Sequence, residues 1–226
     1  MDMVVAGARR RVAQISGVGT LPEYRRRGLN RRLTERALEW ARAGHDFVFL
    51  FADEEAFPFY AATGFRPVQE QVPSVQASAV PPRAGLEPVD PTDPAALAAL
   101  RRAAERRCPV SQQLGVLNVE LLLFHALYPL RGRLHFLPAH QLYVAFSRDE
   151  TGLRVLDLVG EGIPPFAELW PYLSRGREER VEFLFLPDQL ELDRFDWAPL
   201  PGNGTHLRGD FPLEEVPFLF PFTAHA

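Results

Sequence analysis

Three consecutive arginines and a glycine, Arg25 to Gly28, are the residues in this sequence best suited to binding an anion. They lie between a mostly apolar run over 12–20 and a segment with helical spacing. A helix that follows a strand offers unpaired N–H groups and the positive end of its dipole to the turn before it. Arginine adds charge and forked hydrogen bonds. The pattern therefore favours a site for a phosphorylated ligand, with a basic surface loop as the alternative.

A second stretch of interest is Asp-Glu-Glu-Ala-Phe-Pro-Phe-Tyr-Ala-Ala-Thr-Gly-Phe, residues 53–65, where Asp53 is expected to cap a short helix over 54–62. Tyr60 in this helix is open to two interpretations, a catalytic phenol or a packing aromatic ring.

A general base is not evident, because the apolar run over 12–20 holds no carboxylate. The histidines are scattered, and each is more typical of a structural residue. The tail over 222–226 is an exception, because it carries His225 and a terminal carboxylate on an apolar segment that could dock into the cleft.

Composition excludes several kinds of chemistry. Cys108 is the only cysteine, so an intrachain disulfide and a multi-cysteine metal site are excluded, and no His, Cys, Asp or Glu spacing indicates a metal. All 25 basic residues are arginine, which excludes a lysine Schiff base. The net charge of −4 argues against a nucleic-acid partner. No apolar run is long enough for a bilayer and no signal pattern begins the chain, so we expect a cytoplasmic protein with no membrane partner.

The first 80 residues predict the order β-β-α-β-α-β. A hairpin over 3–6 and 11–20 precedes a helix over 22–42, and a buried strand over 47–51 follows it in a parallel crossover. A last strand starts at 65–68 and extends toward residue 80. The residues expected to face the core from the helix are Leu29, Leu33, Ala37, Trp40 and Ala41.

The rest of the chain predicts a second unit after a proline-rich linker over 81–92. Asp93 is expected to cap its first helix, and a second helix is expected over 110–128. The C-terminal forty residues are expected to add irregular strands that cover an edge. The remaining predicted elements are strands over 134–137, 142–146, 153–159 and 181–186 and a helix over 164–173. The strand–turn–helix–strand rhythm of 153–186 parallels that of 12–52 and indicates a degenerate duplication.

Two motifs, Arg-Arg-Arg-Gly-Leu-Asn over 25–30 and the segment over 53–65, resemble the GNAT acetyltransferase superfamily. The arginine-rich motif is also similar to that of the tandem-GNAT enhanced intracellular survival acetyltransferases. The resemblance implies an α/β fold with a mixed sheet. It implies a truncated GNAT half over 1–80 with an acetyl-CoA site and a second GNAT-like unit over 93–226 that lacks the CoA motif.

The resemblance also implies roles for individual residues. Main-chain groups of Val18, Gly19 and Thr20 would hold the pantetheine arm of acetyl-CoA, and Tyr60 would protonate the departing thiolate. Gly28 would be needed because a Cβ would block the phosphates. The pyrophosphate-binding turn and helix start would comprise Arg25, Arg26, Arg27, Gly28, Leu29, Asn30 and Arg31.

The implied function is transfer of acetyl from acetyl-CoA to a primary amine on a small molecule or peptide, with no metal. A catalytically inactive CoA-binding or regulatory protein is the alternative, and a homodimer is a further expectation. A GNAT domain has about three strands and two helices before its first motif, where this chain has roughly ten residues. Those elements would come from 88–146, come from another subunit, or be missing.

Overall fold

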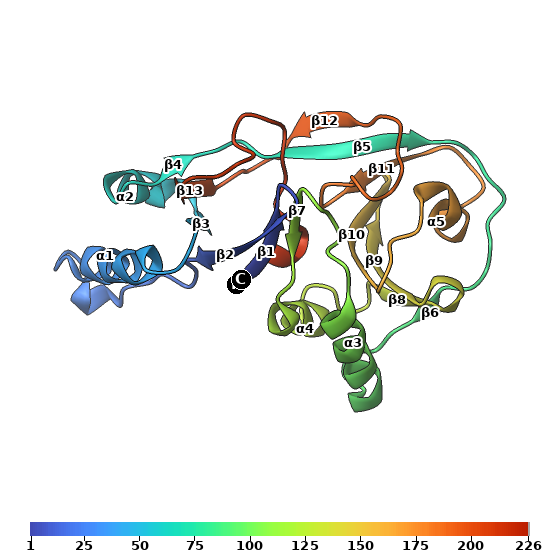
Figure 1. Cartoon of the computed structure of the whole chain (residues 1–226), viewed down its shortest axis with the longest axis horizontal. Helices are drawn as coiled ribbons and strands as arrows, with labels where there is room; N and C mark the ends of the chain where they lie inside the picture. The colour runs from blue at the N-terminus through green and yellow to red at the C-terminus, as the bar shows by residue number, and fades with distance from the viewer. Residues whose placement is uncertain (226) are drawn as a thin grey trace.

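Two mixed β-sheets form the frame of the protein, and the computed structural model describes residues 1–225 (Figure 1). Within those residues, the first sheet has six strands in the order β4-β13-β3-β2-β1-β7. The second has seven, in the order β12-β5-β11-β10-β9-β8-β6. The predicted α/β class with a mixed sheet is therefore confirmed.

The first sheet is built around a parallel strand pair. Its strands are β1 (Asp2–Val5), β2 (Ala8–Gln14), β3 (Phe47–Phe51), β4 (Arg66–Pro67), β7 (Leu114–Val116) and β13 (Thr205–Gly209). β1 and β2 form the predicted hairpin, whose Ala6-Gly7 turn has two positive φ angles, 49° and 73°. β2 and β3 run parallel and are joined through α1 (Leu29–Arg42), which confirms the predicted crossover.

The face that α1 buries differs from the expected one. Thr34, Leu38 and Ala41 are buried, whereas Leu33 is 71% exposed and Trp40 is 65% exposed. Residues three and four positions apart lie on the same face of a helix. The buried residues and the exposed residues therefore form two adjacent faces of α1. Of the five residues expected to face the core only Ala41 is buried, because the less apolar face of the helix, with Thr34 and Leu38, is the one that meets β3.

The second sheet repeats the parallel arrangement. Its strands are β5 (Gln71–Ala77), β6 (Glu87–Pro88), β8 (Leu134–Leu137), β9 (Leu142–Arg148), β10 (Leu153–Val159), β11 (Glu179–Phe183) and β12 (Asp196–Pro199). β10 and β11 are parallel and are connected through α5 (Phe166–Leu173). Each sheet thus contains one parallel β-α-β unit, the feature that the predicted duplication requires.

The helix predicted over 110–128 is wrong over 110–118, nearly half of its length. The segment begins with β7, which pairs with β1, and only then forms α4 (Val119–Leu127). Asn118 caps α4, because its side-chain oxygen accepts a hydrogen bond from the Leu121 N–H at 3.0 Å. The pairing with a strand more than a hundred residues away overrode the local helical pattern.

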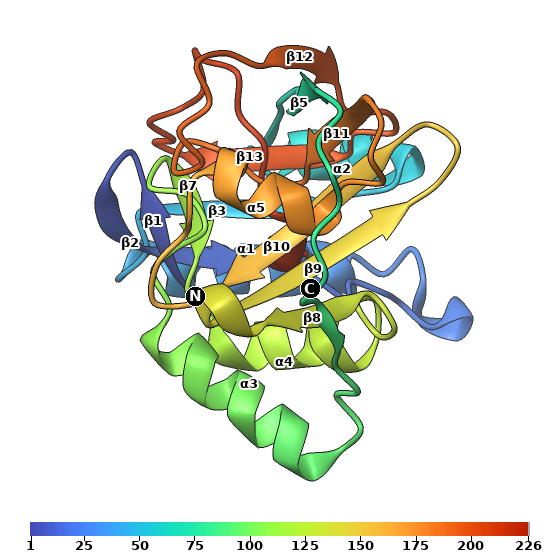
Figure 2. The ribbon, with the colours of Figure 1, turned by 90° about the vertical axis from the view of Figure 1, so that its right-hand side faces the viewer.

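α3 (Pro94–Arg106) packs against α4 along one side of the second sheet (Figure 2). Asp93 caps α3 as predicted, since its carboxylate accepts the Ala95 N–H at 3.1 Å. The remaining helix, α2 (Phe57–Ala62), lies beside α1 on the first sheet.

The sheets do not divide at the predicted linker. β5 precedes residue 80 yet pairs with β11 and β12 in the second sheet, while β7 and β13 follow residue 92 yet lie in the first. β6, within the predicted linker over 81–92, pairs with β8. β13 lies between β3 and β4 rather than covering an edge, and only β12 occupies one. The predicted units over 1–80 and 93–226 therefore exchange strands.

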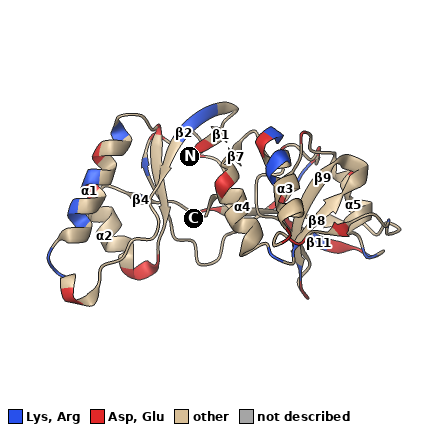
Figure 3. Cartoon of the chain, turned by 90° about the horizontal axis from the view of Figure 1, so that it is seen from below, with Lys and Arg blue, Asp and Glu red and all other residues tan. Residues whose placement is uncertain are grey.

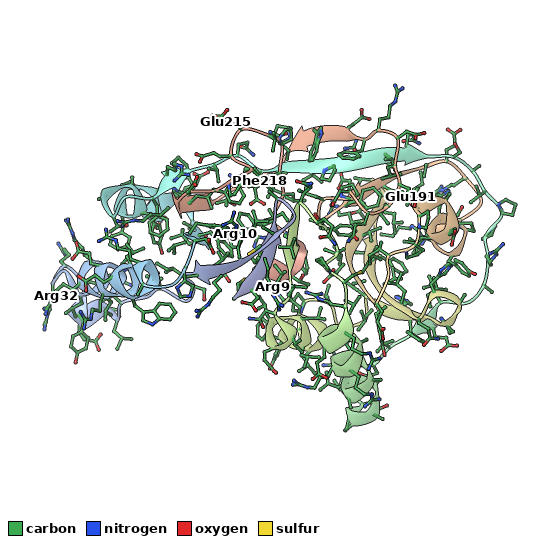
Figure 4. The ribbon with its side chains drawn as sticks, viewed as in Figure 1. Arg9, Arg10, Arg32, Glu191, Glu215 and Phe218 are labelled. Atoms are coloured by element: carbon green, nitrogen blue, oxygen red, sulfur yellow. The ribbon has the colours of Figure 1, made fainter. Side chains whose placement is uncertain are left out.

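Phenylalanines fill the face of the first sheet opposite α1. Phe47 and Phe49 point to this face, whereas Val48 and Leu50 point toward α1 and α2, as the two-residue period of a strand requires. Phe220 stacks on Phe49 with ring centroids 4.6 Å apart, and Phe218 (Figure 4) joins the same cluster. The segment over 211–224 therefore supplies six of the sixteen buried residues of this cluster.

Candidate active site

The parallel strands β2 and β3 separate where the candidate site begins. Their ladder runs from Val12 opposite Phe47 to Gln14 opposite Phe49, and the last bond joins the Ile15 N–H to the Phe49 carbonyl at 3.0 Å. β3 then continues against β13. The strand predicted over 12–20 is thus shorter than expected, because residues 16–20 leave the sheet.

The released segment includes Val18, Gly19 and Thr20, the residues expected to hold the pantetheine arm. Their N–H groups form no backbone hydrogen bond with residues 1–225. The Thr20 carbonyl accepts a bond from Arg25 Nε at 3.2 Å. A backbone with unpaired N–H and C=O groups beside an opened sheet can bind an extended amide-bearing ligand as a strand would.

The turn before α1 is shaped by two left-handed residues. Arg26 has φ 57° and Gly28 has φ 71°. A Cβ built on Gly28 would meet nothing within 4 Å, so the protein's own packing leaves the space in front of the turn open. The φ angle is therefore the reason that the fold itself needs glycine here, and the predicted clash with phosphates would be an additional one.

The first turn of α1 has free hydrogen-bond donors. Gly28 is the N-cap and supplies no side-chain cap, and the first helical bond joins Arg32 N–H to the Gly28 carbonyl at 3.1 Å. The N–H groups of Leu29, Asn30 and Arg31 therefore face the turn without an intrahelical partner. This end of α1, near the labelled Arg32, projects from the body of the protein (Figure 4).

Positive charge surrounds these donors. Arg25, Arg26 and Arg27 are exposed, and within residues 1–225 none of them forms an ion pair. Arg31 differs, because its Nε donates to Glu35 at 2.9 Å. Figure 3 shows basic residues on α1 and on the turn that precedes it. The structure thus brings together every residue expected to bind the pyrophosphate.

Tyr60 lies beside the point where the strands separate. Its side chain packs in one cluster with Leu50 of β3 and with Ile15, the last residue of the ladder. The residue is only 6% exposed, and burial raises its pKa, so the phenol keeps its proton at neutral pH. Its hydroxyl makes no hydrogen bond with residues 1–225 and is available to a ligand.

Asp53 does not cap the helix that carries Tyr60. It precedes a 3-10 turn (Glu54–Ala56), and its side chain accepts no capping bond. α2 instead has Pro58 in its first turn and ends at Ala62, two residues before Gly64, whose φ is 83°. The helix follows Asp53 in the expected order, but Pro58 marks its first turn and the Asp53 carboxylate does not cap it.

The C-terminal tail docks at the end of β3. The His225 ring stacks on Phe51 with centroids 3.6 Å apart, and the His225 carbonyl lies 2.6 Å from His125 Nε2. Burial, with His125 adding to it, lowers the pKa of His225 to about 4, so this ring is neutral at pH 7. The tail therefore docks at the end of β3 through His225, its entry into a ligand cleft stays a prediction, and Ala226 is outside the described residues.

The equivalent gap in the second sheet is filled. Beyond Val155 the parallel strands β10 and β11 part, and Phe222 N–H binds the Leu184 carbonyl at 2.8 Å between them. Thr223 Oγ1 donates to Asp157 at 3.0 Å. The tail therefore occupies the space that a ligand would need, and the turn Gly160–Pro165 has no arginine.

Sequence reasoning missed the buried ion pair that anchors this tail. Asp157 Oδ2 lies 3.4 Å from Arg107 NH1, and both side chains are almost fully buried. The available signal was an aspartate inside an otherwise apolar strand, Leu-Asp-Leu-Val over 156–159, because such a residue is rarely buried without a partner.

Neither a cluster of metal ligands nor a membrane-spanning helix occurs within residues 1–225. Residues 1–225 contain no group of three or more His, Cys, Asp or Glu side chains placed to hold a metal ion. None of the helices in the same range is both long and apolar enough to cross a membrane.

Comparison with known proteins identifies the first part of the chain. Residues 1–68 match the family described as the acetyltransferase (GNAT) domain. No curated protein sequence matches the chain.

Solved structures match nearly the whole chain. They include a probable N-acyltransferase from Enterococcus faecalis V583, with TM-score 0.55, 14% identity and coverage of 92% of this chain and 56% of that one. A GCN5-related N-acetyltransferase from Anabaena variabilis ATCC 29413 has TM-score 0.55 and 19% identity, with coverage of 92% and 57%. Eis1 from Mycobacterium abscessus has TM-score 0.50 and 20% identity, with coverage of 92% and 60%.

The chain thus spans little more than half the length of these solved proteins. At such identities the likeness establishes the fold, while the family match carries the assignment of the N-terminal part. Residues 1–68 therefore belong to the GNAT acetyltransferase superfamily, and the chain as a whole shares the fold of GNAT proteins.

Proposed function

We propose that this protein is an N-acetyltransferase that transfers acetyl from acetyl-CoA to a primary amine. The observation that carries the proposal is the opened pair β2 and β3, which leads directly into a basic turn and an uncapped helix N-terminus. A peptide-like arm followed by a pyrophosphate matches that order of unpaired backbone groups, N–H donors and arginines.

The donor site fits acetyl-CoA because its donors have no other partners. Leu29, Asn30 and Arg31 present N–H groups, and the open space in front of Gly28 admits phosphate oxygens. Arg26 and Arg27 add charge without a competing carboxylate in an ion pair. Acetyl-CoA would supply the acetyl group as a thioester, whose leaving group is a thiolate.

Tyr60 is suited to hold the proton that such a leaving group requires. Its raised pKa keeps Oη protonated, and its position beside Ile15 puts it next to the backbone segment that would hold the arm. The N–H groups near Thr20 are free to polarise a carbonyl oxygen. Direct attack by a neutral amine then needs no covalent enzyme intermediate.

A panel of primary amines with acetyl-CoA tests the proposal through the release of free CoA. We expect at least one amine to give turnover, and the Tyr60→Phe variant to lower kcat by about 100-fold while leaving the Kd for CoA nearly unchanged. A Tyr128→Phe variant, altered at an exposed tyrosine that follows α4 outside this site, is the matched control.

Binding without turnover would favour the second candidate function, a CoA-binding regulatory protein. The specific observation in its favour is the docked tail, whose neutral His225 is a weak base at the end of β3. Absence of CoA binding by calorimetry would contradict both functions.

A further inference from the structure

A cavity of about 680 Å³ lies between α3 and the strands β8 and β9 of the second sheet. Its rim is completed by the loop Gly160–Gly162 that follows β10. None of the residues expected to bind acetyl-CoA lines it, and neither does Tyr60. Its volume is within the range of sites that hold small organic molecules, roughly 300–1,000 Å³.

A tyrosine hydroxyl at this cavity has no partner in the protein. Tyr143 of β9 is only 7% exposed as a residue and lines the cavity. Its hydroxyl forms no hydrogen bond with residues 1–225 and is not among the buried polar atoms, so it is open to the cavity. The hydroxyl is therefore free to bond a ligand there.

A cation stands beside that hydroxyl. Arg102 of α3 lines the cavity and forms neither an ion pair nor a hydrogen bond within residues 1–225. Burial raises the pKa of Tyr143, and the charge of Arg102 opposes the rise, which places the two groups within electrostatic reach of each other. Together they offer a hydroxyl and a guanidinium to one anion.

The carboxylate at the rim is already neutralised. Glu161 accepts a hydrogen bond from Arg106 Nε at 2.6 Å, one turn along α3 from Arg102. That pair holds the loop Gly160–Gly162 against α3 and leaves Arg102 as the cation in excess. The cavity is therefore suited to a negatively charged ligand.

Part of the remaining wall is apolar, beside the polar side chains of His140 and Gln141. Ala99 and Ala103 lie four residues apart on α3, and their small side chains leave the room that larger ones would fill. Opposite them, Phe136 and Tyr143 have ring centroids 4.9 Å apart. Aromatic walls of this kind accept a planar ring.

We propose that this cavity is a binding site for a small aromatic anion, a carboxylate or phosphate ester carried on a planar ring. The anion binds Arg102 and the Tyr143 hydroxyl, and the ring lies between the alanines of α3 and Phe136. The site is separate from the proposed acetyl-CoA site and does not depend on it.

Calorimetry on the full chain with 1-naphthyl phosphate tests the proposal, with 1-naphthalenemethanol as the neutral probe. We expect the phosphate ester to bind at least tenfold more tightly than the alcohol. Arg102→Ala should weaken binding by about tenfold or more, since a charge-assisted hydrogen bond is lost. Ala103→Leu should weaken it by filling the cavity.

Arg101→Ala is the matched control, because Arg101 is the adjacent arginine but pairs with Glu120 at 2.7 Å and does not line the cavity. Equal weakening by Arg101→Ala and Arg102→Ala would overturn the proposal, as would no binding of 1-naphthyl phosphate at millimolar concentration. Displacement of the probe by excess CoA would also overturn it, because the probe would then occupy the other site.

Discussion

Arg26 combines an unfavourable backbone with an exposed charge in the turn before α1. Its φ of 57° is left-handed, a conformation that costs about 1–2 kcal/mol for a residue with a Cβ. A glycine would adopt it without that cost. A charged residue at such a position is therefore explained more readily by its side chain than by the fold.

Replacement of Arg26 separates these two effects. Arg26→Gly and Arg26→Ala should both weaken CoA binding by about tenfold, because each removes a guanidinium from the phosphates. Arg26→Gly should also be more stable than Arg26→Ala by roughly 1 kcal/mol. Calorimetry and urea unfolding measure the two quantities.

Arg36→Ala provides the comparison, because Arg36 lies on α1 and pairs with Glu39 at 3.0 Å. Its removal should leave CoA binding within about twofold of the native value. An unchanged Kd in both Arg26 variants would show that this side chain does not contact the ligand.

At the scale of elements, β10 depends on a charge pair that its neighbours supply. Asp157 directly follows the bulge between Val155 and Asp157 in the pairing of β10 with β9, and it binds Arg107, which follows α3, and Thr223 of the tail. Burial of a carboxylate is tolerated here because Arg107, Thr223 and the Leu158 N–H all donate to it.

Asp157→Ala should lower the free energy of unfolding by about 3–5 kcal/mol, because Arg107 would remain buried and charged with the Val116 carbonyl but no carboxylate as its partner. Thr223→Val removes only one hydrogen bond and should cost about 1 kcal/mol. Urea unfolding of both variants measures the difference. Equal losses for the two would mean that the ion pair contributes nothing beyond an ordinary hydrogen bond.

Local pattern predicted the elements whose neighbours are close in sequence. The hairpin of β1 and β2, the crossover to β3 and the strands β8 to β10 follow from alternation, turn residues and helical spacing. β7 could not be predicted, because Leu114–Val116 becomes a strand only beside β1. Likewise, the spacing of residues in α1 does not show which face of the helix packs against β3, so the buried face could not be predicted.

The candidate site was predictable in part for the same reason. Arg25 to Arg31 form one continuous turn and helix start, so their proximity follows from their order in the sequence. The stacking of His225 on Phe51 and the filling of the gap between β10 and β11 join segments far apart. Such contacts depend on how the two sheets pack.

At the scale of the whole molecule, the two sheets are joined by exchanged strands, and Glu70 lies where they cross. It separates β4 of the first sheet from β5 of the second and is 0% exposed. Its carboxylate accepts the Phe220 N–H at 2.6 Å and bonds Thr205 of β13. Within residues 1–225 no cation forms an ion pair with it.

Burial raises the pKa of Glu70 from 4.5 to about 7, with its two hydrogen bonds opposing the rise. Between pH 4.5 and 7 the folded protein keeps this proton and the unfolded chain loses it, so stability falls as pH rises. The loss amounts to about 3 kcal/mol by pH 7 and does not increase above it.

Glu70→Gln mimics the protonated side chain and should remove this dependence. Its amide can donate to Thr205 Oγ1 and accept from the Phe220 N–H, as the neutral acid does. The free energy of unfolding of the variant, minus that of the native protein, should therefore increase by about 3 kcal/mol from pH 4.5 to pH 7.5. The exposed Glu215→Gln variant should instead follow the native curve, and a Glu70→Gln curve parallel to the native one would show that Glu70 titrates normally where the sheets cross.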